Sequence, residues 1–247
     1  MQNLRRTRRG TRSALETPVI HLFNVEDGRR ATLVLTAHLG EVSYYQRLRR
    51  TIAEFEASVY FESVRSVDPS PAHWDEPYHR FLKSLREDIY AGIASLDIFA
   101  FQGDQLAPEP DWTNADVDCC ALADALRDSQ VPLLRYELAF AVLRRLIQRA
   151  EGGDEAARNI LERALKWGLM AVSFIPVLSF VKLLPRTRAF YAVVNDWRSA
   201  EAVKIVDEAH RDFLLIYGAA HGETILQGLA DRGFRETGRS WMTVFTT

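Results

Sequence analysis

The sequence predicts an α/β (α+β) fold, with a mixed β-sheet formed by the N- and C-terminal segments and a large central helical region. Three observations predict it. Short β-branched and apolar runs, typical of buried strands, occur near both ends of the chain. Between about 78 and 200, apolar residues recur instead at helical spacings of three and four. The composition, 47% hydrophobic and 26% charged, is that of a globular protein and excludes a collagen, a disulfide scaffold or a fully disordered chain.

The length of 247 residues is enough for one sizeable domain. We expect residues 1–16, which are polar and rich in arginine, to form a disordered basic tail. Residues 17–247 would then form a single domain, in which about 78–200 is a mainly helical insertion.

The N-terminal elements follow from local pattern. Apolar runs at 19–25 and 31–35 predict two strands, and the Asp-Gly pair at 27–28 between them predicts a hairpin turn. Apolar side chains at spacings of three and four predict a helix over 44–55. The run ASVYF at 57–61 predicts a short buried strand, and the prolines in 68–77 predict a loop.

The rest of the chain alternates helical patterns with two further strands. Helices are expected at 78–101, 116–128, 133–150, 155–167, 197–209 and 225–232. The apolar run DFLLIY predicts a strand over 212–217, and a last strand is expected over 239–245. Gly233 is placed to cap the helix that precedes it.

Charge is unevenly distributed along the chain. The net charge is −2, but residues 1–12 hold five arginines and no acid, so residues 13–247 carry 26 basic against 33 acidic groups, or −7. Nucleic-acid-binding domains are usually basic, so we expect no nucleic-acid partner. The basic arm would instead contact an anionic lipid surface or an acidic partner.

Cysteine content and hydropathy predict the compartment. The adjacent Cys119 and Cys120 are expected to be reduced, buried structural thiols, because a disulfide between neighbours is strained. No secretory signal is visible, so we expect a cytoplasmic protein, either free or associated with a membrane. Residues 167–181 carry no charge, but the run is shorter than the ~20 residues of a membrane span. It predicts a buried or membrane-leaning helix, and 1–12 with 167–184 would form any membrane-facing surface.

Three polar residues directly follow predicted strands. His38 follows ATLVLTA, Glu62 ends ASVYF, and His221 follows DFLLIYGAA. Open α/β folds build their sites at the ends of such strands. Two imidazoles and one carboxylate are a common ligand set for a catalytic divalent metal, so these residues are candidate metal ligands. The alternative is that each is a satisfied polar group at a strand end.

Other catalytic motifs are missing from the sequence: there is no GxSxG, Walker or GxGxxG motif. A backbone anion site at Gly218 is a weaker candidate for substrate binding. The remaining histidines are expected to have ordinary structural roles, and a nucleophilic role for the two cysteines is less favoured than a structural one.

These residues also carry a resemblance. The stretches TAHLGEVSYYQRL, SVYFESV, DWRSAEAV and LLIYGAAHGETILQGLADRGFRETGRSWMTVF resemble the TraB/PrgY/Tiki superfamily, which includes the GumN proteins. The match rests on Gly218 to His221 as a Gly-x-x-His motif and on Glu62 as the strand-end glutamate. Two positions depart from the family pattern: Leu35 stands in place of a glycine, and Ser199 in place of the asparagine after Arg198.

The resemblance implies a metal-dependent hydrolase, or metallopeptidase, that acts on a peptide or other amide bond. Zn, Mn or Co would be held by His38, Glu62 and His221. Glu62 and Arg198 would be the catalytic residues, with Arg198 stabilising an oxyanion or binding a substrate carboxylate. The alternative is a non-catalytic protein that binds a peptide or small molecule, and the two departures favour it.

Overall fold

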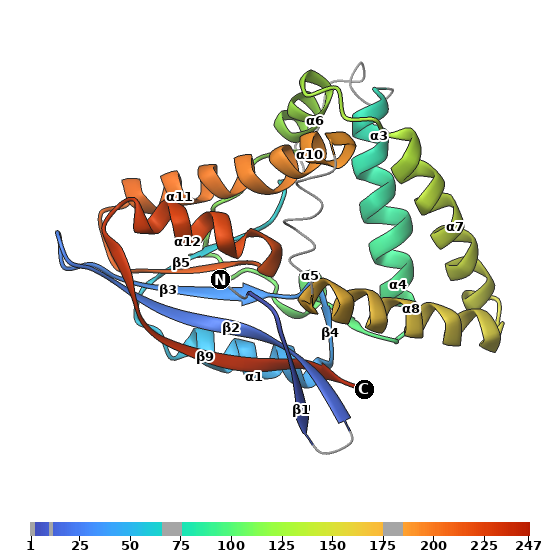
Figure 1. The fold of residues 1–247 in the computed structure, drawn as a ribbon, viewed down its shortest axis with the longest axis horizontal. Coiled ribbons are helices and arrows are strands. Elements are labelled where there is room, and N and C mark those ends of the chain that lie inside the picture. The colour runs from blue at the N-terminus through green and yellow to red at the C-terminus, as the bar shows by residue number, and fades with distance from the viewer. Residues whose placement is uncertain (1–2, 10–11, 66–75, 175–184) are drawn as a thin grey trace.

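A computed structural model describes residues 3–9, 12–65, 76–174 and 185–247. It confirms the predicted fold class, a mixed sheet combined with helices (Figure 1). The strands are β1 (Arg5–Arg9), β2 (Arg12–Asn24), β3 (Arg30–Thr36), β4 (Leu39–Gly40), β5 (Ser58–Phe61), β6 (Ala100–Phe101), β7 (Thr113–Asn114), β8 (Phe213–Gly218) and β9 (Phe234–Thr246).

The helices of the N-terminal and central parts are α1 (Val42–Ala53), α3 (Pro77–Ser84), η1 (Leu85–Tyr90), α4 (Ala91–Ser95), α5 (Gln102–Gln105), α6 (Cys119–Asp128), α7 (Leu134–Glu151) and α8 (Glu155–Phe174). Those of the C-terminal part are α10 (Pro185–Tyr191), η2 (Ala192–Trp197), α11 (Arg198–Glu208), the short turn η3 (Ala219–His221) and α12 (Gly222–Ala230).

The main sheet joins the two ends of the chain. Its order is β1-β2-β3-β8-β5-β7, and β9 pairs with β2. The strands β3, β8, β5 and β7 are parallel, whereas β2 is antiparallel to β3 and β9. The predicted hairpin between β2 and β3 is confirmed, with Gly28 at φ +79° in the turn. The parallel strands therefore end at one common edge of the sheet.

Helices cover both faces of the sheet, α1 on one side and α11 with α12 on the other (Figure 1). Side chains of β8 alternate between two cores. Leu214 and Ile216 pack with Tyr45 of α1, while Leu215 and Tyr217 pack with α11 and α12. A strand buried on both faces is continuously apolar, which explains the run DFLLIY.

The prediction of a disordered tail over 1–16 is wrong for the described residues of that range. Residues 5–9 form β1, paired antiparallel with the beginning of β2. Arg5 forms an ion pair with Glu16 at 2.6 Å, and its guanidinium lies 4.2 Å from the ring centre of Trp241. Arg5 thus anchors residues 5–9 to the sheet, because its charge is paired with Glu16 and its guanidinium stacks on an aromatic ring.

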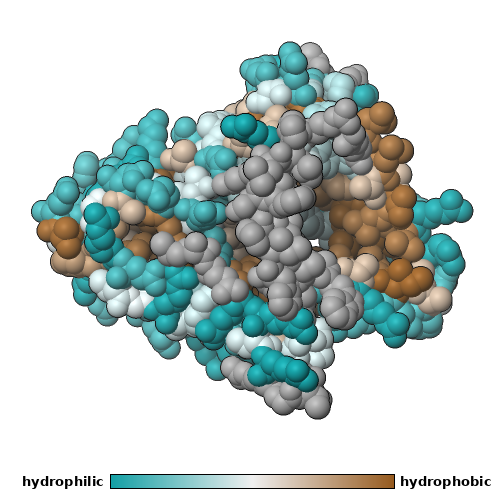
Figure 2. All heavy atoms as spheres, viewed as in Figure 1, coloured by the Kyte–Doolittle hydropathy of each residue, from teal (hydrophilic) through white to brown (hydrophobic). Residues whose placement is uncertain are grey.

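The central helices stand beside the sheet (Figure 1). The single helix predicted over 78–101 is wrong at its C-terminal end: α3, η1 and α4 follow one another to Ser95, and Asp97 turns the chain at φ +53°. A third core, between α3, α6 and η2, includes Leu122 and Leu126. Figure 2 shows apolar residues gathered over the helical part, and α7 leaves Leu134, Leu138 and Val142 more than 60% exposed.

The uncharged segment 167–181 is only partly described. Residues 167–174 form the last two turns of α8, and 175–181 lie outside the described residues, as does most of the loop predicted over 68–77. Within the described part of the chain, no helix combines the length and the apolar character needed to cross a bilayer.

Candidate functional site

The predicted site residues gather at the carboxyl edge of the parallel strands. His38 lies two residues after β3, Glu62 directly follows β5, and His221 ends the turn η3 that follows β8. Since β8 lies between β3 and β5, the three strand ends are neighbours. Asp116 follows β7 next in the sheet, and Arg198 begins α11 above this edge. We call His38, Glu62, Asp116, Arg198 and His221 the edge cluster.

Glu62 is the centre of the edge cluster. Its side chain is 4% exposed, Oε1 accepts a hydrogen bond from Arg198 Nη2 at 2.8 Å, and Oε2 accepts one from the Gly218 N–H at 2.5 Å. Burial opposes its ionisation, but the charges of His221, Arg198 and His38, with the Gly218 N–H, lower the pKa of Glu62 to about 2. Glu62 is therefore an anion at neutral pH.

Arg198 is held by two carboxylates. Its Nε donates to Asp116 Oδ1 at 2.9 Å and its Nη2 to Oδ2 at 2.5 Å, a bidentate pair, in addition to the bond to Glu62. Burial opposes its charge, but Asp116 and Glu62 raise the pKa of the guanidinium above its usual value. The side chain of Arg198 is only 8% exposed, and its bond to Glu62 holds that carboxylate in position. The contact between Arg198 and a substrate stays a prediction.

The tautomer of His221 follows from its neighbours. Ser199 Oγ donates its only hydrogen to the Asn195 carbonyl at 2.7 Å, so it accepts from His221 Nδ1–H at 2.9 Å. Burial lowers the pKa of His221 against the opposing pull of Glu62, which favours the neutral ring. The unprotonated Nε2 then lies 3.5 Å from Glu62 Oε1. A separation of this size suits a nitrogen and an oxygen that bind the same divalent ion at about 2.0–2.2 Å each.

Position 218 needs a glycine because neighbouring side chains approach its backbone closely. A Cβ on Gly218 would lie 2.9 Å from Glu62 Oε2 and 3.4 Å from His38 Nε2, with His221 Cδ2 at 3.6 Å. All three predicted ligands therefore surround one point. The Gly218 N–H, predicted to bind a substrate anion, binds the carboxylate of Glu62 instead.

His38 differs from the other members because its side chain is exposed. The ring of Tyr90, at the end of η1, has its centre 6.1 Å from that of His38 and stacks on Phe101. Burial and the charge of Glu62 raise the pKa of Tyr90. His38 is thus the member of the edge cluster that is exposed to solvent.

The edge cluster is looser than a formed metal site. Among the described residues, the group of three potential ligands whose donor atoms all lie within 4.8 Å of one another is His79, Cys119 and Cys120, and not His38, Glu62 and His221. The donor types nevertheless fit a divalent ion. An unprotonated imidazole nitrogen faces an ionised carboxylate, and one guanidinium is shared by two buried carboxylates.

Sequence reasoning missed Asp116, Tyr90 and the role of Ser199. Asp116 carried the same signal as Glu62, an acid just after a strand, but β7 has only two residues and its apolar pattern is too short to recognise. Ser199 differs from the asparagine of the family that the sequence resembles, and its hydroxyl orients His221. Leu35, the other difference, lies in the core against Gly222, where an added Cβ would collide with Leu35 Cδ1.

A surface hollow lies at the opposite ends of β5 and β8, lined by residues that include Ser58, Thr113 and Asp212. It shares no residue with the edge cluster, and its Asp212 is paired with the exposed Arg30. The edge cluster remains the stronger candidate on its chemistry. No protein-family model, curated protein or solved structure matches this chain.

Proposed function

We propose that the edge cluster is the active centre of a metal-dependent hydrolase that cleaves a peptide or other amide bond. His38, Glu62 and His221 would hold the ion, which is Zn, Mn or Co. The observation that carries the proposal is the 3.5 Å separation between the unprotonated Nε2 of His221 and the ionised Oε1 of Glu62.

The charge of the edge cluster supports a bound cation. Glu62 and Asp116 are buried carboxylates, and Arg198 is the guanidinium they share. With His221 neutral, Glu62, Asp116 and Arg198 together carry one net negative charge, which a bound cation or a proton on one of the two histidines would neutralise. Such a charge is costly unless a cation neutralises it.

The chain's own residues would prepare the site for hydrolysis. Arg198 and the Gly218 N–H hold both oxygens of Glu62, so the carboxylate does not rotate. Ser199 fixes the imidazole of His221. The low pKa of Glu62 makes it a weak proton acceptor, so it acts best as an anionic ligand. A divalent ion bound here lowers the pKa of its water toward neutrality.

The test uses Mn²⁺, which prefers oxygen and nitrogen ligands to thiolates. Free Mn²⁺ is followed by its electron paramagnetic resonance signal, and cleavage of a random peptide mixture by mass spectrometry. We expect one bound ion and Mn²⁺-stimulated cleavage, with affinity reduced at least about tenfold in His38→Ala, Glu62→Gln and His221→Ala. The exposed His210→Asn variant is the control and should match wild type. Equal affinity in all variants, or no binding by wild type, overturns the proposal.

A second candidate is a non-catalytic protein that binds a peptide or small molecule. One observation favours it: Arg198 and the Gly218 N–H already bind the protein's own carboxylates, so neither is free to stabilise charge on a substrate oxygen. Peptides that are retained by the protein without cleavage, with Mn²⁺ present, would support this candidate.

The proposal places the protein in the cytoplasm, with contact to a membrane surface through 1–12 and 167–184. Flotation with anionic and with neutral vesicles tests it. Binding to anionic vesicles that falls with salt supports the contact. If the protein floats with neither kind of vesicle, the proposed contact with a membrane surface is wrong.

A further inference from the structure

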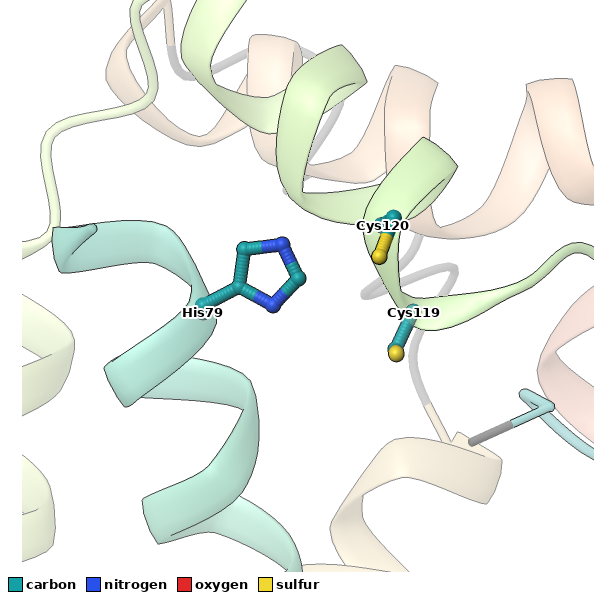
Figure 3. A group of neighbouring side chains, drawn as sticks. All are labelled: His79, Cys119 and Cys120. Atoms are coloured by element: carbon teal, nitrogen blue, oxygen red, sulfur yellow. The ribbon is translucent and has the colours of Figure 1, made fainter. Parts of the chain in front are cut away.

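A second group of potential ligands lies in the helical region, away from the edge cluster. His79 comes from the first turn of α3, and Cys119 with Cys120 from the first turn of α6. Their donor atoms all lie within 4.8 Å of one another. Figure 3 shows the imidazole directed from α3 toward the two thiols.

The local structure fixes all three positions. The side chain of Asp118 caps α6 by accepting from the Ala121 N–H at 2.8 Å, which places both cysteines in the first turn. The side chain of Glu76 caps α3 by accepting from the His79 N–H at 3.0 Å. The third core packs α3 and α6 together immediately beyond these starts. Two capped helix ends thus present their side chains to each other.

The two cysteines are not the buried structural thiols that the sequence predicts. Neither is in a disulfide and both are half-buried, whereas His79 is 8% exposed. The site is therefore closed on the imidazole side and open to solvent on the thiol side. A water molecule would complete the coordination of an ion bound by these three side chains.

The donor chemistry selects a thiophilic ion. Two sulfurs and one imidazole suit Zn²⁺ or a similar d¹⁰ ion, and not Mg²⁺ or Ca²⁺. Binding Zn²⁺ would release one proton from each thiol to solvent, with no change in oxidation state. The resulting unit of one dication, two thiolates and a neutral imidazole carries no net charge, so its partial burial costs little.

We propose that His79, Cys119 and Cys120 form a Zn²⁺ site that links α3 to α6. The ligand atoms around one zinc lie about 3.3–3.8 Å apart, given Zn–S bonds near 2.3 Å and Zn–N bonds near 2.0 Å. The observed group, within 4.8 Å, needs a contraction of about 1 Å, within reach of side-chain rotation. The site does not depend on the function proposed for the edge cluster.

Co²⁺ is a suitable probe because thiolate coordination gives a charge-transfer band in the near ultraviolet. The full chain is reduced, stripped with a chelator and titrated with Co²⁺, then with Zn²⁺ to displace it. Since the chain has only two cysteines, alkylation with and without Zn²⁺ counts the protected thiols directly. We expect the band in wild type, its loss on adding Zn²⁺, and protection of both thiols.

Variants assign the band to its ligands. Cys119→Ser and Cys120→Ser should each weaken Co²⁺ binding strongly, and His79→Gln should weaken it at least about tenfold. His210→Asn is the matched control, and His221→Ala, which removes the edge-cluster ligand, should leave the band unchanged. Circular dichroism confirms that each variant is folded.

Three outcomes overturn the proposal. They are the lack of a charge-transfer band in folded wild type, alkylation of both thiols at the same rate with and without Zn²⁺, and His79→Gln affinity equal to that of wild type. A failure of the edge-cluster test with Mn²⁺ changes none of these measurements.

Discussion

Replacing Arg198 with methionine tests the electrostatic account of the edge cluster. The variant removes the one guanidinium that pairs with two buried carboxylates and keeps much of its apolar volume. Removing one partner of a buried ion pair costs about 3–5 kcal/mol, because the remaining charge is left uncompensated. The control is Arg30→Met. Arg30 also pairs with a carboxylate at 3.0 Å, but its side chain is 81% exposed, so we expect a loss below about 1 kcal/mol.

The pH dependence gives a second, independent readout. In the folded protein the pKa of Glu62 is about 2, below its ordinary 4.5. Ionised Glu62 therefore stabilises wild type fully above about pH 4.5, by about 3 kcal/mol, and this stabilisation is lost as the pH falls toward 2. Without Arg198, the pKa of Glu62 rises toward its ordinary value, because one of the charges that oppose the effect of burial is lost. Ionised Glu62 then stabilises the variant less than it stabilises wild type, and this difference shrinks as the pH falls and the carboxylate is protonated.

The assay is urea unfolding of wild type, Arg198→Met and Arg30→Met at pH 7 and pH 4. We expect the difference between wild type and Arg198→Met to be largest at pH 7 and to shrink at pH 4. Adding Asp116→Asn to Arg198→Met should recover part of the loss, since it removes one of the unpaired charges. Equal losses for the two arginine variants, or a loss that does not change with pH, would refute the reasoning.

Three further predictions concern the site and the core. Gly218→Ala should reduce Mn²⁺-stimulated cleavage at least about tenfold, because the new Cβ would stand 2.9 Å from a carboxylate oxygen, while Gly238→Ala, with no neighbour nearer than 3.7 Å, should keep full activity. Ser199→Ala should weaken Mn²⁺ binding about 10–100-fold by freeing the tautomer of the buried histidine, measured by titration, with unfolding midpoints checked separately. Leu126→Ala should lower the free energy of unfolding by about 2–5 kcal/mol, whereas Leu138→Ala, 61% exposed, should change it by less than about 0.5 kcal/mol in the same urea assay.

The strands β3 and β8 could be predicted from the sequence because they are buried on both faces and therefore continuously apolar. The run over 212–217 became β8 with a shift of one residue, and the Asp-Gly turn placed the β2–β3 hairpin. The strand over residues 5–9 could not be predicted, because its position depends on Glu16 in the next strand and on Trp241 near the far end of the sequence. The composition of a short segment does not reveal contacts with residues that are distant in the sequence.

The candidate site shows the same division. His38, Glu62 and His221 could be found because each follows an apolar strand. Their proximity to one another could not be predicted, because the order of the strands in the sheet decides which strand ends are neighbours. Asp116 follows a strand too short to recognise, and the pairing of His79 with the cysteines depends on how α3 packs against α6.

The position of β8 has a consequence for synthesis of the protein. The strand lies between β3 and β5 in the sheet, yet it is made after both, and β9 completes the pairing of β2 only near the end of the chain. While the chain emerges from the ribosome, no strand yet lies between β3 and β5. The edge of each strand that later pairs with β8 therefore stays open. A chain that stops before residue 213 would expose these edges and lack His221, so the same late strand that closes the sheet also completes the edge cluster.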